Sequence, residues 1–60
     1  MLFCRIGHIL VGFYQWPEDK THWHYAVMRP IPAGHQTFFG KGLSLPAAIE
    51  NAAIKVDQLS

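Results

Sequence analysis

Two histidines flank a tryptophan in the segment His22-Trp23-His24. On an extended strand, alternate residues lie on one face, so this spacing could place two imidazole nitrogens beside a zinc ion. Cys4, His8 and His35 could supply further ligands, but no Cys-x-x-Cys or His-Glu-x-x-His frame accompanies them. The pattern leaves open whether His22 and His24 bind a metal. We interpret the histidines as hydrogen-bonding residues and expect no metal and no cofactor.

Catalytic chemistry has little support in the sequence. The carboxylates are Glu18 and Asp19 in a turn-like segment and Glu50 and Asp57 in a helix-like one, and local spacing pairs none of them with a histidine. Cys4 and a histidine could form a nucleophile and base, but so short a chain has little room for a pocket that excludes water. We therefore expect a structural, buried Cys4 and a protein that is not an enzyme.

The size of the chain favours a partner. Sixty residues bury only about 60% of the surface that the unfolded chain exposes, so residues 1–60 should form one marginally stable domain. A single cysteine excludes an intrachain disulfide. The net charge of +1 lacks the basic excess typical of proteins that bind phosphate backbones. The free cysteine, and the lack of a leader-like pattern in residues 1–16, favour a cytoplasmic protein, and no apolar stretch is long enough to span a membrane.

Proline and glycine divide the chain into strands. Turn chemistry at Pro17–Thr21 and Pro30–Gly34 predicts two chain reversals. The runs that they separate predict three antiparallel strands, Phe3–Tyr14, Trp23–Arg29 and Gln36–Phe39, and the pattern leaves open an extension of the third to Lys41. The first run is apolar on both faces, so it should be central or covered twice, with a bend or bulge at its glycines.

The last segment predicts a helix. Ser44 is a strong N-cap, Pro46 suits the first turn, and the helix should run to about Leu59. An apolar stripe at helical spacing would face the sheet, and it comprises Leu45, Ile49, Ala52, Ala53, Val56 and Leu59. Ile54 would face solvent. The predicted class is α+β, with a three-stranded antiparallel sheet followed by one C-terminal helix on one face (β-β-β-α).

One helix covers only one face of a sheet, so this composition leaves apolar and aromatic surface for a partner. Under regular alternation, Trp23, Tyr25 and Arg29 share a side of their strand. Thr37, Phe39 and Lys41 likewise share a side of the next strand. The predicted partner-binding residues are the aromatic anchors Trp16, Trp23, Tyr25 and Phe39, with Arg29 and Lys41 orienting the partner by charge.

The segment Phe39-Gly40-Lys41-Gly42-Leu43-Ser44, leading into the alanine-rich stretch 45–53, resembles the strand-to-helix step of HicB-type antitoxins. That family neutralises an RNA-cleaving toxin by covering it. The resemblance spans about a third of the chain and carries over no functional residue. The β-β-β-α order also resembles the ethylene-response-factor DNA-binding domain and the arm-binding domain of some phage integrases, in which a three-stranded sheet enters the major groove.

Two functions follow as hypotheses. The first is a non-enzymatic interaction protein that inhibits or modulates a larger protein by steric occlusion, similar in style to phage-encoded inhibitors, including anti-CRISPR proteins, and to antitoxins. The alternative is a small DNA- or RNA-binding domain that reads nucleic acid with its sheet. A homodimer would satisfy the same apolar surface. The sequence does not identify the target or decide which face of the sheet the helix covers.

Overall fold

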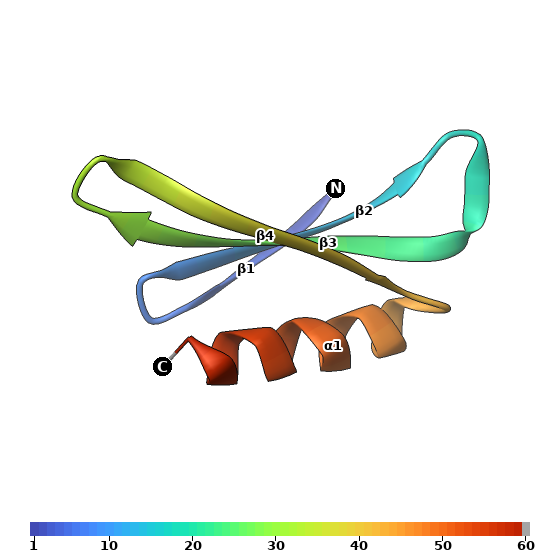
Figure 1. Ribbon diagram of the computed structural model, residues 1–60. Helices are drawn as coiled ribbons and strands as arrows, with labels where there is room; N and C mark the ends of the chain where they lie inside the picture. Colours follow the sequence, from blue (N-terminus) through green and yellow to red (C-terminus); the bar gives the residue numbers. More distant parts are fainter. Residues whose placement is uncertain (60) are drawn as a thin grey trace.

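A computed structural model describes residues 1–59 of the chain and contains four strands followed by one helix. The elements are β1 (Leu2–Ile6), β2 (Ile9–Trp16), β3 (Asp19–Ile31), β4 (Gly34–Gly42) and α1 (Leu45–Gln58). Each strand pairs antiparallel with the next, so the sheet is a meander in the order β1-β2-β3-β4. The helix lies against one side of this sheet (Figure 1). The predicted α+β class, with an antiparallel sheet and one C-terminal helix, is confirmed.

The predicted number of strands is wrong, because the run Phe3–Tyr14 forms two strands instead of one. The chain reverses at Gly7 and His8, between Ile6 and Ile9, which pair with each other. Gly7 has a φ of +61°, a left-handed conformation that glycine adopts without a steric penalty. The segment before this turn is therefore an edge strand, β1, and of the two strands formed by this run only β2 lies inside the sheet.

The two predicted reversals are confirmed in position, but the strands beside them are longer than expected. β3 begins at Asp19, directly after Pro17 and Glu18, and β4 begins at Gly34, which has a φ of +138°. Pro30 is part of β3 although proline cannot donate a ladder hydrogen bond. It is accommodated because the pairing of β2 with β3 ends at Met28, so Pro30 pairs only with β4.

The helix begins as predicted. The Ser44 hydroxyl accepts a hydrogen bond from the Ala47 N–H at 3.2 Å, and Pro46 lies in the first turn. α1 packs mainly on β3 and β4 and less on β2, and within the described residues it makes no contact with β1. Its buried residues are Ala48, Ala52 and Val56. Ile49 and Ala53, predicted to face the sheet, are exposed, because the stripe that packs is narrower and is centred on the alanines. No helix within residues 1–59 is long and apolar enough to cross a membrane.

The core lies between α1 and the face of the sheet that α1 covers. Val11 and Val27 are its largest fully buried side chains, and Phe13 and Tyr25 complete its centre. Glycines on β4 make room for this packing. The ring of Tyr25 occupies the space where a Cβ of Gly40 would lie. A Cβ on Gly42 would lie 2.5 Å from the Ala48 nitrogen and 2.8 Å from the Ala47 carbonyl carbon, so the first turn of α1 sits directly on this glycine.

We expect Gly42→Ala to destabilise the protein by about 1–3 kcal/mol, because the added methyl meets helix backbone that cannot rotate away. Gly12→Ala is the matched control. There the new Cβ would meet the movable ring of Phe3 at 3.2 Å, so we expect a change within about 1 kcal/mol. Urea unfolding of both variants measures the difference. Equal stabilities would contradict the close approach of α1 to β4.

Candidate binding face

The face of the sheet opposite α1 is uncovered, and we call it the open face. Its central row is set by the strand register, which aligns Phe3, Gly12, Ala26 and Phe39 across the four strands. The two middle residues are small and the two outer ones are large, so the row forms a trough. A depression of about 460 Å³ follows it, and its lining is Met1, Phe3, Gly12, Tyr14, Trp16, Ala26, Met28 and Phe39. The open face is therefore a hollowed, predominantly apolar surface.

An aromatic cluster closes one end of the trough. The rings of Tyr14 and His24 stack with centroids 5.4 Å apart and an interplanar angle of 17°. The Trp16 ring meets both edge-on, at centroid distances of 5.6 Å from Tyr14 and 5.9 Å from His24. The His24 Nε2 atom is buried in this cluster and has no hydrogen-bond partner within residues 1–59. Mutual packing holds these rings in place, which lowers the entropy cost of presenting them to a partner.

Charge is distributed unevenly between the two layers. The register places Arg5 on the open face beside the trough and Lys41 in the row that contains Tyr14 and His24. The four carboxylates lie elsewhere: Glu18 and Asp19 at the β2–β3 turn, and Glu50 and Asp57 on α1. The open face therefore carries cations beside its apolar trough. Strands β1, β2 and β4 contain no acidic residue.

The six predicted partner-binding residues fall on both sides of the sheet. Trp16, Phe39 and Lys41 lie on the open face, where Phe39 is 71% exposed. The other three face the helix layer. Tyr25 is only 8% exposed in the core, and Trp23 packs partly buried against that core. Trp23, Tyr25 and Arg29 share one face of β3, as predicted, and Phe39 and Lys41 share one face of β4. Tyr25 pairs with Gly40, the neighbour of Phe39, so these two groups of residues lie on opposite faces of the sheet.

Arg29 lies at the end of the covered face, away from the trough. Its guanidinium donates a hydrogen bond to Gln36 Oε1 and lies 5.9 Å from the centroid of the Phe38 ring. The Lys55 ammonium group on α1 approaches the same ring at 5.3 Å. Phe38, in the middle of β4, thus contacts one cation from β3 and one from α1, so both cations serve the packing of the two layers.

Sequence reasoning missed Met1, Phe3, Tyr14 and Met28, which line the trough. Recognition of Met1 and Phe3 requires the turn at Gly7, because the register of β1 places Phe3 opposite Gly12. The alternation of β2 and β3 contained a usable signal. Gly12 and Ala26 interrupt otherwise bulky faces, and paired small residues on adjacent strands indicate a depression.

The residues considered for chemistry do not converge. Cys4, predicted to be buried, is exposed, because β1 is an edge strand that α1 does not cover. His24 stacks on Tyr14, whereas His22 lines a groove beside α1. Within residues 1–59, no three side chains of His, Cys, Asp or Glu are grouped so that they could hold a metal ion.

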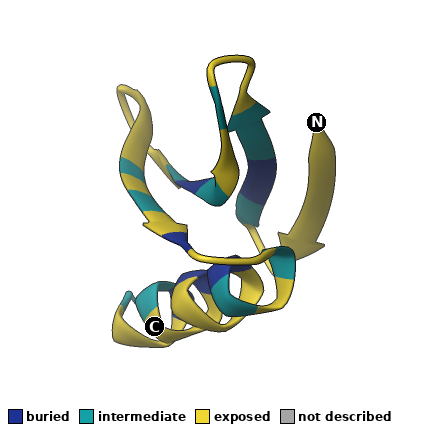
Figure 2. Ribbon diagram, turned by 90° about the vertical axis from the view of Figure 1, so that its right-hand side faces the viewer, coloured by how far each residue is buried: buried dark blue, intermediate teal, exposed yellow. Residues whose placement is uncertain are grey.

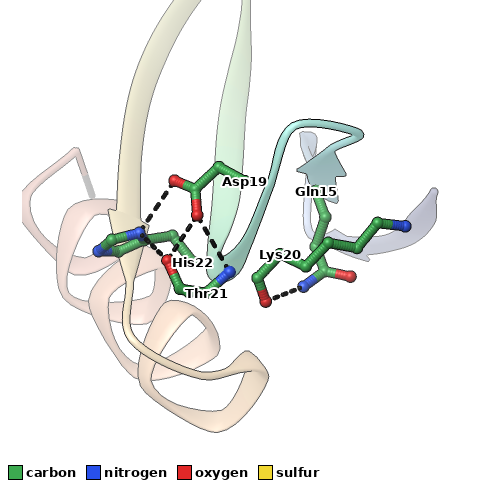
Figure 3. Close-up of polar contacts among 5 residues, drawn as sticks. All are labelled: Gln15, Asp19, Lys20, Thr21 and His22. Carbon is green, nitrogen blue, oxygen red and sulfur yellow. Dashed lines mark hydrogen bonds and ion pairs between the residues drawn. The ribbon is translucent and has the colours of Figure 1, made fainter.

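Local spacing does pair one carboxylate with a histidine, contrary to expectation. Asp19 accepts hydrogen bonds from the Thr21 hydroxyl and, at 3.0 Å, from the Thr21 backbone N–H, and its other oxygen lies 3.0 Å from His22 Nδ1 (Figure 3). These groups are close because all three residues are near neighbours at the start of β3. The Thr21 hydroxyl, then the Thr21 N–H, and then His22 lower the pKa of Asp19 from 3.8 to about 2. The position of Asp19 and His22 at a hairpin end, where both are half-buried, indicates a structural role.

Comparisons with protein-family models, with curated proteins and with solved structures gave no match for this chain.

The lowered pKa of Asp19 predicts an acid-dependent loss of stability. A carboxyl whose folded pKa is below its unfolded value stabilises the fold fully above the unfolded pKa, and this contribution falls as pH drops from roughly 4 to 2. We expect Asp19→Asn to lose less stability than wild type over this interval. Glu18→Gln, which changes the neighbouring turn carboxylate, should retain the wild-type dependence. Urea unfolding at several pH values measures the free energy of unfolding of each variant. The same fall of this free energy between roughly pH 4 and 2 in wild type and Asp19→Asn would contradict the prediction.

Proposed function

We propose that this protein is a non-enzymatic interaction protein that inhibits or modulates a larger protein by covering part of its surface. The observation that carries the proposal is the apolar trough on the open face, bounded by Phe3 and Phe39 and closed by the aromatic cluster at Trp16. Contiguous exposed apolar surface of this kind is typical of interaction sites. The action would be steric occlusion in the cytoplasm, in the manner of small phage-encoded inhibitors and antitoxins.

The composition of the face favours a protein partner of particular chemistry. Interface centres are enriched in aromatic residues and methionine, and binding energy concentrates in such anchors. The trough contains both kinds and few polar atoms, so it suits a protruding apolar side chain on the partner. Arg5 and Lys41 beside the trough would attract carboxylates that flank this protrusion. The proposed partner is therefore a protein with an apolar projection in an acidic setting.

Photo-crosslinking can identify and test such a partner. A benzophenone amino acid at position 39 should capture one protein from lysate of the source organism, whereas the same group at position 43 should not. Leu43 is a matched control because it is 78% exposed but lies in the segment between β4 and α1. With the captured protein purified, we expect Phe39→Ala to raise the Kd about tenfold or more, with Leu43→Ala near wild type.

Charge reversal then tests the electrostatic part of the proposal. Lys41→Glu should weaken binding and slow association, because the open face would lose one of its cations and gain an acid. A Kd unaffected by both Phe39→Ala and Lys41→Glu would overturn the assignment of the open face.

The cations on the open face favour nucleic acid as a second candidate ligand. Arg5 and Lys41 accompany exposed aromatic rings on an uncovered sheet, a combination that suits single-stranded DNA or RNA through phosphate contacts and base stacking. The charge of +1 for the whole chain limits the affinity that such contacts can reach.

Tryptophan fluorescence separates the two candidates. If a single strand stacks on the open face, an oligo(dT) or oligo(U) titration should quench Trp16, and Trp16→Phe should abolish most of the change because Trp23 lies on the covered side. The affinity should fall steeply with salt, and less steeply for Lys41→Gln. An unchanged spectrum at low salt would exclude the nucleic-acid function.

A further inference from the structure

The edge strand β1 is open along its whole length. All five of its residues are exposed (Figure 2). α1 packs on β2, β3 and β4, and Ile6 at the end of β1 borders a hollow shared with the helix. One edge of β1 pairs with β2, and the other has no neighbouring strand within residues 1–59. An edge strand presents unpaired backbone N–H and C=O groups that can pair with another strand. Leu2, Phe3 and Ile6 add exposed apolar side chains on both of its faces.

β1 also lacks most of the features that usually protect an edge. It contains no proline, glycine, lysine or bulge, and its one charged residue is Arg5. The opposite edge strand, β4, does carry such protective features. It contains Lys41 and three glycines, α1 packs against it, and the Asn51 side chain donates a hydrogen bond to the Lys41 carbonyl at 3.0 Å. Of the two edges, β1 is therefore the one available for association.

We propose that β1 pairs antiparallel with β1 of a second copy of this chain, about a two-fold axis that passes beside Cys4. Two four-stranded sheets would then join into one continuous sheet. In this register Leu2 lies opposite Ile6 of the second copy, Phe3 opposite Arg5, and Cys4 opposite Cys4. Both helices lie on the same side of the joined sheet.

The sequence of β1 is self-complementary in this register. On the helix side, Leu2 and Ile6 form two apolar pairs, and on the open side each Arg5 lies beside a Phe3 ring, a favourable cation–π pair. Opposed residues in an antiparallel pair have their side chains on the same face of the sheet. A shift of one residue would break this rule, so the competing symmetric registers are shifted by two residues. Each of these shifted registers pairs only three residues of β1, against five in the register about Cys4; one places Arg5 opposite Arg5, and the other places Phe3 opposite Phe3. The complementarity of Leu2 with Ile6 and of Phe3 with Arg5 favours a second copy of this chain as the partner.

The strength of the dimer follows from its size. A five-residue strand is about 17 Å long, and its pairing buries much less than the roughly 800 Å² per partner of a standard interface. We therefore expect reversible association that dissociates on dilution. This proposal does not depend on the proposed function, since it is carried by the unpaired backbone edge of β1, although Phe3 and Arg5 belong both to the open face and to the paired strands.

Cysteine cross-linking tests the register. Opposed residues in an antiparallel pair have Cα atoms about 4.5–5.5 Å apart, within the range that a disulfide spans. Diamide removes one hydrogen from each of two opposed thiols and is itself reduced to the hydrazide. We expect wild type to cross-link quickly at concentrations where sedimentation velocity shows a dimer. A cysteine moved to the exposed position 43, in the Cys4→Ser background, should cross-link slowly.

The register has a second, sharper test. In the Cys4→Ser background, Leu2→Cys mixed with Ile6→Cys should cross-link, whereas either variant alone should not. Cross-linking that is equal for all these combinations would overturn the proposal.

Charge substitution at an exposed site tests the same interface without cysteine chemistry. Phe3→Lys places a cation opposite Arg5 in both halves of the dimer and should weaken association about tenfold, because symmetry applies the repulsion twice. Phe3→Glu places an acid there and should retain the dimer. A wild type that remains monomeric at high concentration, or a dimer that responds equally to both substitutions, would overturn the pairing.

Discussion

The close approach of α1 to β4 is the constraint on which the rest of the structure depends. Gly42 allows the backbone of the first helical turn to rest on the sheet, and Ala48 and Ala52 keep the helix near the strands along its length. A side chain at position 42 or a larger one at position 48 would lift the helix away. The helix then shields the valines of β2 and β3 from water, which is the main source of stability in so short a chain.

The position of the helix also decides which surfaces stay open. Because α1 lies over β3 and β4, it leaves the opposite face of the sheet and the whole of β1 exposed. The open face is hollowed where Gly12 and Ala26 lie side by side, and it carries Arg5 and Lys41 while the acids lie at the turn and on the helix. The same docking thus generates a core, an apolar trough with a cationic border, and an unprotected strand edge. The core accounts for folding, the trough supports the proposal for binding, and the strand edge supports the proposal for association.

Much of the fold could be predicted from local chemistry, and the failures have physical causes. The cap at Ser44 and the turns at Pro17 and Pro32 act within a few residues, so their signals are readable in the sequence. The turn at Gly7 was missed because apolar residues continue on both sides of it and no polar cluster marks it. That omission hid the edge strand, which in turn made Cys4 look buried and left Phe3 unassigned.

The sequence by itself determined the α+β class, the helix and its cap, and which residues share a side within each strand, because these properties depend on neighbours along the chain. Only the tertiary structure decided which side the helix covers. β2 and β3 are apolar on both faces, so alternation alone cannot choose between Tyr25 and Phe39 as a core residue. The choice comes from Gly40 and Gly42, which lie opposite Tyr25 and Trp23 and admit the Tyr25 ring and the helix on that side. Phe39 consequently faces the opposite way, and the candidate site lies there with it.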